Sequence, residues 1–427
     1  MDNTINPPHY ATNQLSKYSS DLIEVPALNC SKTEYHDIKK LNRLQKIQLE
    51  SSFYCLTKSR IKFDRHLERD SRYEYLKGDT NSYVNLKALS YDENKSEEDN
   101  NAFKRKYKYF FSMNLYNNEE VLPYLIQELL LLFKFLGGEN VFLSIYENGS
   151  RDKTKSILKK IIKDLKKFDI KHSVVMENHS RPDEFHRIEY LAKIRNRALD
   201  PLVSEKNNGR VYDKIIFMND IFFCRNDILE LIYQSDLQES DFTCPLDFHS
   251  APDSDPPLEF RDSWVARDIE GRKFNGNLGA VSDHAETLLR NQQNLPFQVQ
   301  CSWNGVAILN PKPFYEENSI RFRRSYAGAG ECSASECSLL CNDFWQRGYR
   351  RFVVVPEILV FYRLENAVLP DVKYDRAISI NQTLDEKVKY VDGPEQIICI
   401  GLEAMNAIDP EQPELWINYT TSGTKVT

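Results

Sequence analysis

Short apolar runs alternate with longer amphipathic segments along the chain from residue 107 onward. The apolar runs have the length of β-strands and lie at residues 109–113, 141–146, 174–176 and 214–218. The segments after them predict helices that end near residue 136 and that span 153–168, 186–202 and 227–233. Strands that alternate with helices in this way are typical of parallel βαβ units. The sequence therefore predicts an α/β fold with a doubly wound, mostly parallel sheet flanked by helices.

The first of these helices has the clearest boundary signals. Residues 117–120 read Asn-Asn-Glu-Glu, which supplies a cap and an acidic first turn, and Gly137 with Gly138 stops the helix after residue 136. The regular alternation ends near residue 245. Residues 248–280 then read as loops, and residues 303–365 mix short strands and helices.

The chain divides into three predicted regions. Residues 1–104 form a polar leader with a weak helical pattern at 38–56, and the charged run at 92–99 marks the entry into the main domain. Residues 105–365 carry the α/β domain, and residues 366–427 form a C-terminal tail that we expect to pack on it. With 12% aromatic residues in 427, the chain has ample material for a large core.

Charge and targeting signals exclude some classes of protein. The formal net charge of −7 argues against a protein whose main role is to neutralise nucleic-acid phosphates. No stretch reaches the roughly 18 uninterrupted apolar residues of a membrane helix, because the closest, 121–136, is broken by polar residues. The N-terminus lacks the basic and apolar regions of a signal peptide. We therefore expect membrane association only through a region not visible in this sequence.

The cysteines and the sequons do not decide the compartment. The nine cysteines include no CxxC pair, which makes a zinc ribbon or a thioredoxin-type site an unlikely use of them, and their odd number leaves at least one unpaired within the monomer. Sequons for N-glycosylation begin at Asn29, Asn94, Asn148, Asn178, Asn381 and Asn418. The histidines lack metal-binding spacing, and no GxGxxG or phosphate-binding P-loop occurs.

An open α/β sheet binds its ligand at the carboxyl ends of its strands, so the residues there are the candidates. Residues 146–154 follow the second strand and read Tyr-Glu-Asn-Gly-Ser-Arg-Asp-Lys-Thr. Glu147 is suited to accept from a base or ribose, while Ser150 and the helix amides face anionic oxygens. The alternative is a plain strand-to-helix turn in which Asp152 caps the helix.

Two further strand-end segments carry charged or polar side chains. In the helix at 187–197, Arg187 and Arg195 fall within roughly 80° of each other, so a guanidinium there could hold a diphosphate. The alternative is a surface charge paired with a neighbouring carboxylate. At the end of the fourth strand, Asn219 and Asp220 stand between apolar residues, and Asp220 could bind a divalent cation that bridges two phosphates. An Asx-turn at the strand exit is the alternative.

The later part of the chain holds the remaining candidates. Carboxylates beside an aromatic ring, as in residues 261–268, are a common way to hold sugars, although a surface loop has the same composition. Residues 244–248 and 301–305 add polar groups near apolar ones. Glu336 is either an inward-facing carboxylate or a helix-cap partner.

Taken in order, these segments resemble one family. The motifs are Tyr-Glu-Asn-Gly-Ser-x-Asp-x-Thr at 146–154, Tyr-Leu-Ala-x-x-Arg-Asn at 190–196, Asn-Asp at 219–220, Leu-Asp-Phe at 246–248, the stretch 264–268, Cys-Ser-Trp-Asn-Gly at 301–305 and Ser-Glu-Cys at 335–337. Their order over residues 107 to about 365 is similar to that of the fungal α-1,3-mannosyltransferases typified by the cryptococcal mannosyltransferase and the capsule-associated proteins, glycosyltransferase family 69.

The resemblance implies a GT-A-like fold, a GDP-mannose donor, Mn²⁺ or Mg²⁺ as cofactor, a mannose-containing glycan acceptor and a retaining α-1,3 transfer. Within the main domain, residues 105–245 would form the donor half and 246–365 the acceptor half. The residues it places at the donor are Glu147, Asn148, Ser150, Asp152, Arg195 and Asn219, with Asp220 at the metal. Those on the sugar and acceptor side are Asp262, Trp264, Trp303 and Asn304, and the candidate catalytic carboxylates are Asp247, Asp268 and Glu336. Retention by a nucleophilic carboxylate and retention by front-side attack both fit this set.

The sequence departs from the family's pattern at two points. A GT-A enzyme usually presents Asp-x-Asp, whereas residues 218–220 read Met-Asn-Asp and offer one acidic ligand. Family members usually have an N-terminal membrane helix that anchors them in the Golgi, the location that the resemblance implies. No stretch of this sequence predicts such a helix. Two alternatives therefore stay open: a transferase that uses UDP-xylose or UDP-glucose, and a non-catalytic partner in polysaccharide assembly. A nucleic-acid partner is not expected.

Overall fold

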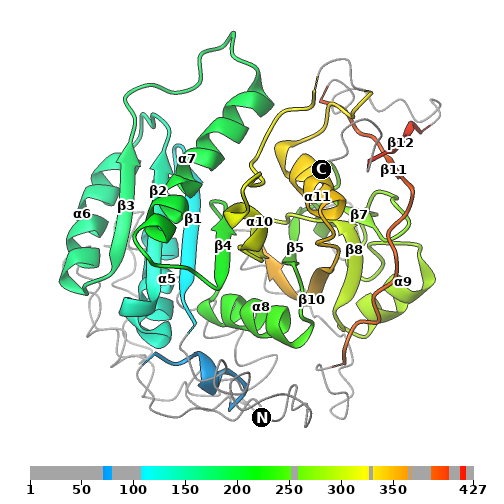
Figure 1. The fold of residues 1–427 in the computed structure, drawn as a ribbon, viewed down its shortest axis with the longest axis horizontal. Coiled ribbons are helices and arrows are strands. Elements are labelled where there is room, and N and C mark those ends of the chain that lie inside the picture. Colours follow the sequence, from blue (N-terminus) through cyan, green and yellow to red (C-terminus); the bar gives the residue numbers. More distant parts are fainter. Residues whose placement is uncertain are drawn as a thin grey trace, which may run out of the picture.

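The computed structural model describes residues 71–78, 107–251, 258–326, 330–363, 366, 386–402 and 414–419. Most of them build around one large sheet with the strand order β3-β2-β1-β4-β9-β5-β10-β8-β7 (Figure 1). The predicted leader lies outside the described residues except for 71–78, and the weak helical pattern at 38–56 lies wholly outside them.

The first half of the sheet is parallel throughout. Its strands are β1 Tyr109–Leu115, β2 Val141–Glu147, β3 Lys171–Met176 and β4 Lys214–Met218. Its helices are α5 Leu122–Leu136, α6 Thr154–Lys167, α7 Arg187–Asn207 and α8 Arg225–Leu237. In Figure 1, α6 lies beside β3 at one edge of the sheet. Each predicted strand and helix of this half is present, and the predicted α/β class is confirmed.

The apolar pattern explains how this half packs. In α6, Ile157, Leu158, Ile161 and Leu165 are buried while the lysines between them are exposed, so the helix covers the sheet with one face. Strand β1 is almost entirely buried because the sheet has neighbours on both of its faces.

Two helix boundaries differ from the expected ones. Helix α5 begins at Leu122, with Val121 in the capping position and no side-chain cap. The side chain of Asn118 accepts a hydrogen bond from the Tyr116 amide at 2.6 Å and is used elsewhere, so it does not cap the helix. Helix α7 continues to Asn207 through Pro201, past the predicted end at residue 202.

The second half of the sheet is mixed. Its strands are β5 Phe242–Ser250, β6 Leu258–Phe260, β7 Arg267–Asp268, β8 Phe297–Cys301, β9 Val306–Leu309 and β10 Phe352–Val360. Its helices are α9 Ala285–Gln292, α10 Lys312–Tyr315 and α11 Glu336–Gln346. Strands β9 and β8 run antiparallel to their neighbours, whereas β5 and β10 pair in parallel. The segment expected to be loop-like at 248–280 therefore contains the end of β5 and two short strands.

Strand β9 joins the two halves because it pairs with β4 on one side and β5 on the other. At this joint the buried ring of Trp303 packs against Phe217 of the first half and Phe242 of the second. The core is thus continuous across the joint, and residues at the end of β4 face residues from the second half.

Disulfides tie down the second half and the described part of the tail. Cys301 is bonded to Cys341, and Cys332 is bonded to Cys399. Cys224 is also disulfide-bonded. The tail further contributes β11 Gln396–Ile398 and β12 Trp416–Asn418, which pair with each other. Among the helices of the described residues, none combines the length and the apolar character needed to span a bilayer.

Candidate functional site

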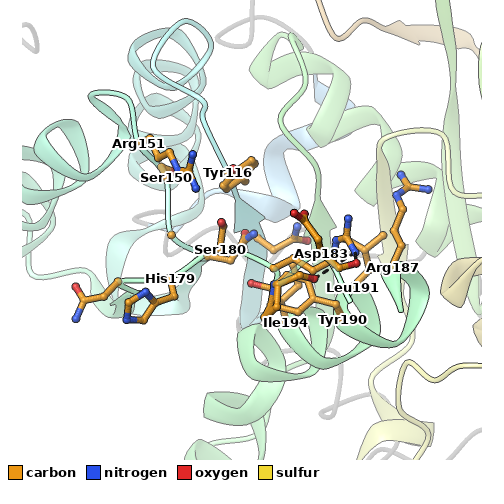
Figure 2. Close-up of a pocket in the computed structure, with 16 residues that line it drawn as sticks. Tyr116, Ser150, Arg151, His179, Ser180, Asp183, Arg187, Tyr190, Leu191 and Ile194 are labelled. Carbon is orange, nitrogen blue, oxygen red and sulfur yellow. Dashed lines mark hydrogen bonds between the residues drawn. The ribbon is translucent and has the colours of Figure 1, made fainter. Parts of the chain in front are cut away.

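A cavity of roughly 920 Å³ opens at the carboxyl ends of β1, β2 and β3. Figure 2 shows Ser150 and Arg151 on one side of it and Arg187, Tyr190, Leu191 and Ile194 of α7 on the other. The turn after β3 contributes residues 178–183 to its wall. Of the residues predicted at the donor, Asn148 and Ser150 line this cavity. We call it the strand-end cleft.

Gly149 gives the strand-end cleft its shape. Its φ of 87° lies in the left-handed region, and a Cβ built there would come within 2.3 Å of the His179 carbonyl carbon. Only glycine accommodates both this backbone conformation and this close approach. The turns that follow β2 and β3 can therefore touch and form one continuous wall.

The turn after β2 also holds the loop after β1. The Ser150 hydroxyl accepts from the Asn117 amide at 2.9 Å, and the Thr154 hydroxyl accepts from the Asn118 amide at 2.7 Å. Asp152 accepts from the amides of Glu119 and Thr154, both at 2.9 Å. Burial opposes the ionised form of Asp152, but these hydrogen bonds prevail and lower its pKa. Asp152 thus accepts from the first residue of α6, although Lys153 holds the capping position and α6 has no side-chain cap.

Glu147, predicted at the donor, lies under the cleft. Its carboxylate is fully buried and accepts from the Ser150 amide through Oε1. Its Oε2 has no hydrogen-bond partner among the described residues, although Lys155 Nζ lies 3.9 Å away. The arrangement fixes the turn and leaves one carboxylate oxygen unsatisfied beside the cleft.

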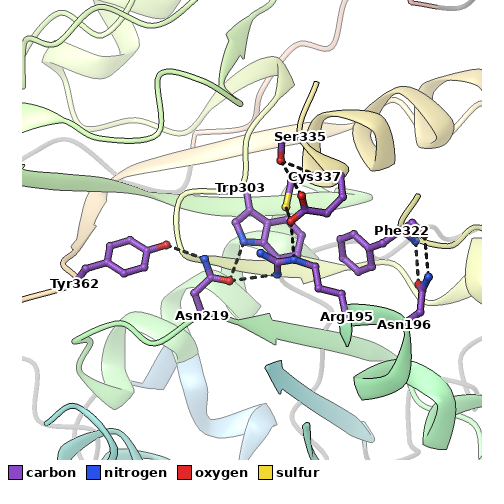
Figure 3. Close-up of polar contacts among 9 residues, drawn as sticks. Arg195, Asn196, Asn219, Trp303, Phe322, Ser335, Cys337 and Tyr362 are labelled. Atoms are coloured by element: carbon purple, nitrogen blue, oxygen red, sulfur yellow. Dashed lines mark hydrogen bonds and ion pairs between the residues drawn. The ribbon is translucent and has the colours of Figure 1, made fainter. Parts of the chain in front are cut away.

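Asn219, at the end of β4, is the centre of a network of side chains (Figure 3). Its Oδ1 accepts from Arg195 Nη1 and from Trp303 Nε1, each at 3.2 Å. Its Nδ2 donates to the Tyr362 hydroxyl at 2.7 Å. The amide is therefore held from three directions, and it connects the two halves of the sheet.

Arg195 of α7 is buried, and its charge is balanced inside the protein. Its Nε donates to Glu336 Oε1 at 2.9 Å, so Glu336 of α11 is an inward-facing carboxylate. The guanidinium also lies over the Trp303 ring, 4.8 Å from its centroid. Such a buried, stacked arginine keeps its orientation, and removing either partner would leave an uncompensated buried charge.

Asp220 follows Asn219 and points toward the loop after β1. Its Oδ2 accepts from Asn118 Nδ2 at 2.7 Å. Burial raises the pKa of Asp220, although the guanidinium groups of Arg261 and Arg195 favour its ionised form. The side chain is thus bonded to the loop that borders the strand-end cleft, and the charges of the two arginines act on it.

Asp247 of β5 and Asp262 form a pair of carboxylates on the second half. Burial, together with the neighbouring Asp262, raises the pKa of Asp247 to about 8. Burial also raises the pKa of Asp262 to about 6. Asp247 is fully buried, and its Oδ2 has no hydrogen-bond partner among the described residues. Arg261 Nη1 lies 3.7 Å from that oxygen, and its guanidinium stacks on Tyr362, 3.8 Å from the ring centroid.

The turn at 301–305 supports this carboxylate pair. Asn304 has a φ of 52° and donates its backbone amide to Asp262 Oδ2 at 3.1 Å. Its side chain donates to the Pro245 carbonyl at 2.6 Å. Asp262 and Asn304, both predicted on the sugar and acceptor side, therefore come together with Asp247, whereas the Trp303 indole N–H is directed to Asn219.

Two predicted residues are engaged elsewhere. Asp268 accepts from the amides of Glu270 and Arg272 and from the Ser282 hydroxyl, contacts that organise a turn. Trp264 donates its indole N–H to the Ile400 carbonyl at 2.8 Å and so helps to hold the tail. Neither side chain makes a hydrogen bond to Asn219, Asp220 or Asp247 within the part of the chain that the structure describes.

Sequence reasoning did not single out Asn118, Arg261 and Tyr362 for these contacts. The stretch at 117–120 predicts a helix cap and the stretch at 261–268 predicts a sugar-holding segment, so neither Asn118 nor Arg261 is singled out. Tyr362 carries no local signal, because it follows β10 in an otherwise apolar stretch. Only the pairing of β10 with β5 brings it to the end of β4.

Comparison with known proteins adds two findings from sequence. Residues 108–343 match the family described as "Cryptococcal mannosyltransferase 1". An alpha-1,3-mannosyltransferase of Cryptococcus neoformans is 31% identical over 315 residues. The aligned region covers 68% of this chain and 64% of that relative, so the chain spans less than two thirds of the relative's length.

Several solved structures resemble the chain at low similarity. A mannosyltransferase from Pyrobaculum calidifontis in complex with GDP-Man and Mn²⁺ is 10% identical, covers 74% of this chain and 68% of its own, and has a TM-score of 0.37. TarS of S. aureus is 14% identical, covers 60% of each chain and has a TM-score of 0.34. At such scores the similarity carries no argument about ligands.

Proposed function

The chain belongs to the family of the cryptococcal mannosyltransferase 1, and from this premise we propose that it transfers mannose from GDP-mannose to an α-mannoside. We propose an α-1,3 linkage, retention at the anomeric carbon and dependence on a divalent metal. The name of the relative, an alpha-1,3-mannosyltransferase, supports the sugar and the linkage.

One observation carries the proposal: Asp220 lies at the end of β4, is linked through Asn118 to the loop that borders the strand-end cleft, and has its ionised form favoured by the charges of Arg195 and Arg261. Its Oδ2 is bonded to Asn118, whose backbone amide is bonded to Thr154 in the turn that follows β2. A nucleotide in the cleft would therefore extend its diphosphate toward Asp220. The leaving diphosphate gains negative charge, and fixed cationic groups stabilise such charge most strongly when they are preorganised.

The residues around Asp220 fit a magnesium or manganese ion that the substrate helps to hold. Within the described residues, no group of three or more His, Cys, Asp or Glu side chains could hold a metal by itself. Mg²⁺ commonly binds through one or two carboxylates plus substrate phosphates and water, so one aspartate is a sufficient protein ligand. Such an ion would supply positive charge to the diphosphate oxygens. Asp220 would hold it, and Asn118 would orient Asp220.

The arginines act alongside this carboxylate. Arg195 is held by Glu336, Asn219 and the ring of Trp303, so its orientation is set before any ligand arrives. Arg261 is partly exposed and can approach a ligand without losing its stack on Tyr362. We propose that Arg195 is a fixed positive charge that orients the diphosphate. We propose that Arg261 contacts the diphosphate from the solvent-exposed side of the site.

On the sugar side we assign Asp247 as the carboxyl group that faces the mannose. Of the three candidate catalytic carboxylates, Glu336 is paired with Arg195, and Asp268 is engaged in its own turn. Asp247 alone of these three has a buried oxygen without a hydrogen-bond partner among the described residues. A buried oxygen left without a partner costs free energy unless a ligand satisfies it. A sugar hydroxyl is a ligand of the required chemistry.

We place the protein in the lumen of the secretory pathway. The disulfides Cys301–Cys341 and Cys332–Cys399 support this location, because disulfides persist in oxidising compartments and are rare in the cytosol. The resemblance to Golgi transferases points the same way.

Transfer assays test the proposal directly. The protein is incubated with an α-mannobiose acceptor, Mn²⁺ and, in separate reactions, GDP-mannose, UDP-xylose or UDP-glucose, and the acceptor is analysed by mass spectrometry. We expect an acceptor longer by one hexose with GDP-mannose only. Transfer from a UDP-sugar alone would change the donor, and no transfer from any donor would favour a non-catalytic partner in polysaccharide assembly.

A further inference from the structure

Tyr362 contacts Arg261 directly and is linked to Arg195 through the Asn219 amide. It follows β10, and the adjacent residue Phe361 accepts a backbone hydrogen bond from Phe222 at 2.7 Å. This pairing places Tyr362 against the turn that carries Asn219 and Asp220. Nothing in the proposed transfer assigns Tyr362 a part, and the inference drawn from it rests on that proposed function.

The two ends of the Tyr362 side chain serve different arginines. The hydroxyl accepts from Asn219 Nδ2 at 2.7 Å, and the other end of the same amide accepts from Arg195 Nη1. The face of the ring carries the Arg261 guanidinium at 3.8 Å, a distance at which planar stacking and cation–π attraction both operate. One side chain therefore contacts the Arg261 guanidinium directly and the Arg195 guanidinium through Asn219.

The hydroxyl contact is not needed to hold the backbone. The Asn219 amide N–H donates to the Gly305 carbonyl at 2.8 Å, and the Phe222 amide donates to Phe361. Asp220 itself is held by Asn118. Removal of the hydroxyl alone should therefore leave the turn in place while it removes one of the three contacts that hold the Asn219 amide.

We propose that Tyr362 is a positioning residue that orients two guanidinium groups of the site, Arg195 through the Asn219 amide and Arg261 through the face of its ring. It acts when negative charge develops on the leaving diphosphate, because misoriented guanidinium groups stabilise that charge less. It contributes less to ground-state binding of the donor, which the strand-end cleft holds by other contacts.

Kinetics of Tyr362→Phe test the hydroxyl arm. We expect kcat to fall about tenfold, the usual effect of one misplaced hydrogen-bonding group, with KM for GDP-mannose changed by less than about threefold. Tyr349→Phe is the matched control, because Tyr349 is also half-buried and its hydroxyl donates to Glu316, outside the site. The control should match Tyr362→Phe in thermal stability and retain wild-type kcat.

A double-mutant cycle tests the path through Asn219. If the hydroxyl acts through this amide, Tyr362→Phe should cause no further loss of kcat in an Asn219→Ala background. Tyr362→Leu, which also removes the ring, should lose more than Tyr362→Phe in both backgrounds because it releases Arg261. The contribution of the ring is then the difference in kcat between Tyr362→Leu and Tyr362→Phe.

The outcomes are separable from those of the proposed function. Wild-type transfer from GDP-mannose reports on the function, whereas only the ratio of variant to wild type reports on Tyr362. If the wild type transfers no sugar to the acceptor, the same cycle is measured on the rate of GDP release from GDP-mannose, which reports the departure of the same diphosphate. A Tyr362→Phe enzyme within twofold of wild-type kcat, or an equal loss in the Asn219→Ala background, overturns the proposal.

Discussion

The two halves of the sheet build their parts of the site in different ways. In the parallel half, the polar side chains of the motif at 146–154 bond to backbone amides of the neighbouring loop, as Ser150 and Asp152 do. In the mixed half, the carboxylates face other charged side chains, as Asp247 faces Arg261 and Glu336 faces Arg195. The turn after β2 therefore provides shape, whereas the second half provides buried carboxylates, one of which pairs with Arg195 of the first half. Asp220 lies at the joint and belongs to both.

Substitution of Asp220, at the joint, should lower sugar transfer more than any other change proposed here. Asp220→Ala should lower transfer by at least roughly a hundredfold, because charge stabilisation of the leaving diphosphate is lost. Circular dichroism and thermal melting should show a folded protein, since the backbone of the turn is held independently. Asp200→Asn, on the exposed side of α7, is the control and should stay near wild-type activity. Full activity of Asp220→Ala would show that Asp220 takes no part in the transfer.

The parallel half should be sensitive to backbone shape. Gly149→Ala should lower the free energy of unfolding by about 2 to 4 kcal/mol, because it adds left-handed strain to a contact of 2.3 Å with the His179 backbone. GDP affinity should fall with it. Gly209→Ala isolates the strain, since Gly209 has a φ of 79° and no atom within 4 Å of an added Cβ.

Gly209→Ala should cost about 1 kcal/mol and leave GDP affinity unchanged. Chemical denaturation and calorimetry measure both quantities. Equal losses in the two variants would mean that the contact between the turns after β2 and β3 does not shape the cleft.

The contribution of the mixed half to the free energy of unfolding should depend on pH. The pKa of Asp247 is raised from 3.8 to about 8 on folding, so the folded state binds a proton that the unfolded state releases. The stability from this proton is present at low pH and is lost as pH rises toward 8. The groups that face Asp247 are Asp262, Arg261, Tyr362 and Cys244.

Asp247→Asn removes this titration. The difference in unfolding free energy, variant minus wild type, should therefore become more favourable by about 1 to 3 kcal/mol between pH 5 and pH 8. Thermal or urea unfolding at both pH values measures it. Thr243→Ser is the control, because it lies on the same strand and carries no ionisable group, so its difference should not depend on pH.

The sequence predicted the parallel half well and the mixed half poorly. Runs such as 109–113 and the helix at 153–168 are specified by local periodicity, because a strand or an amphipathic helix buries one face whatever its distant partners are. The pattern predicts an end to the regular alternation near residue 245 and loops from residue 248, yet β5 spans Phe242–Ser250. Its polar residues Asp247 and His249 break the apolar pattern, and only pairing with β10 and β6 compensates for them.

By itself, the sequence determined the α/β class, the family and the candidate residues at the strand ends, because each depends on short segments read in order. The tertiary structure decided which candidates meet. It paired Arg195 with Glu336 across 141 positions, joined Asn219 to Tyr362 across 143 and turned Asp268 and Trp264 to other contacts. Contacts at such separation depend on strand order and on the packing of side chains around Trp303, and no local pattern encodes either.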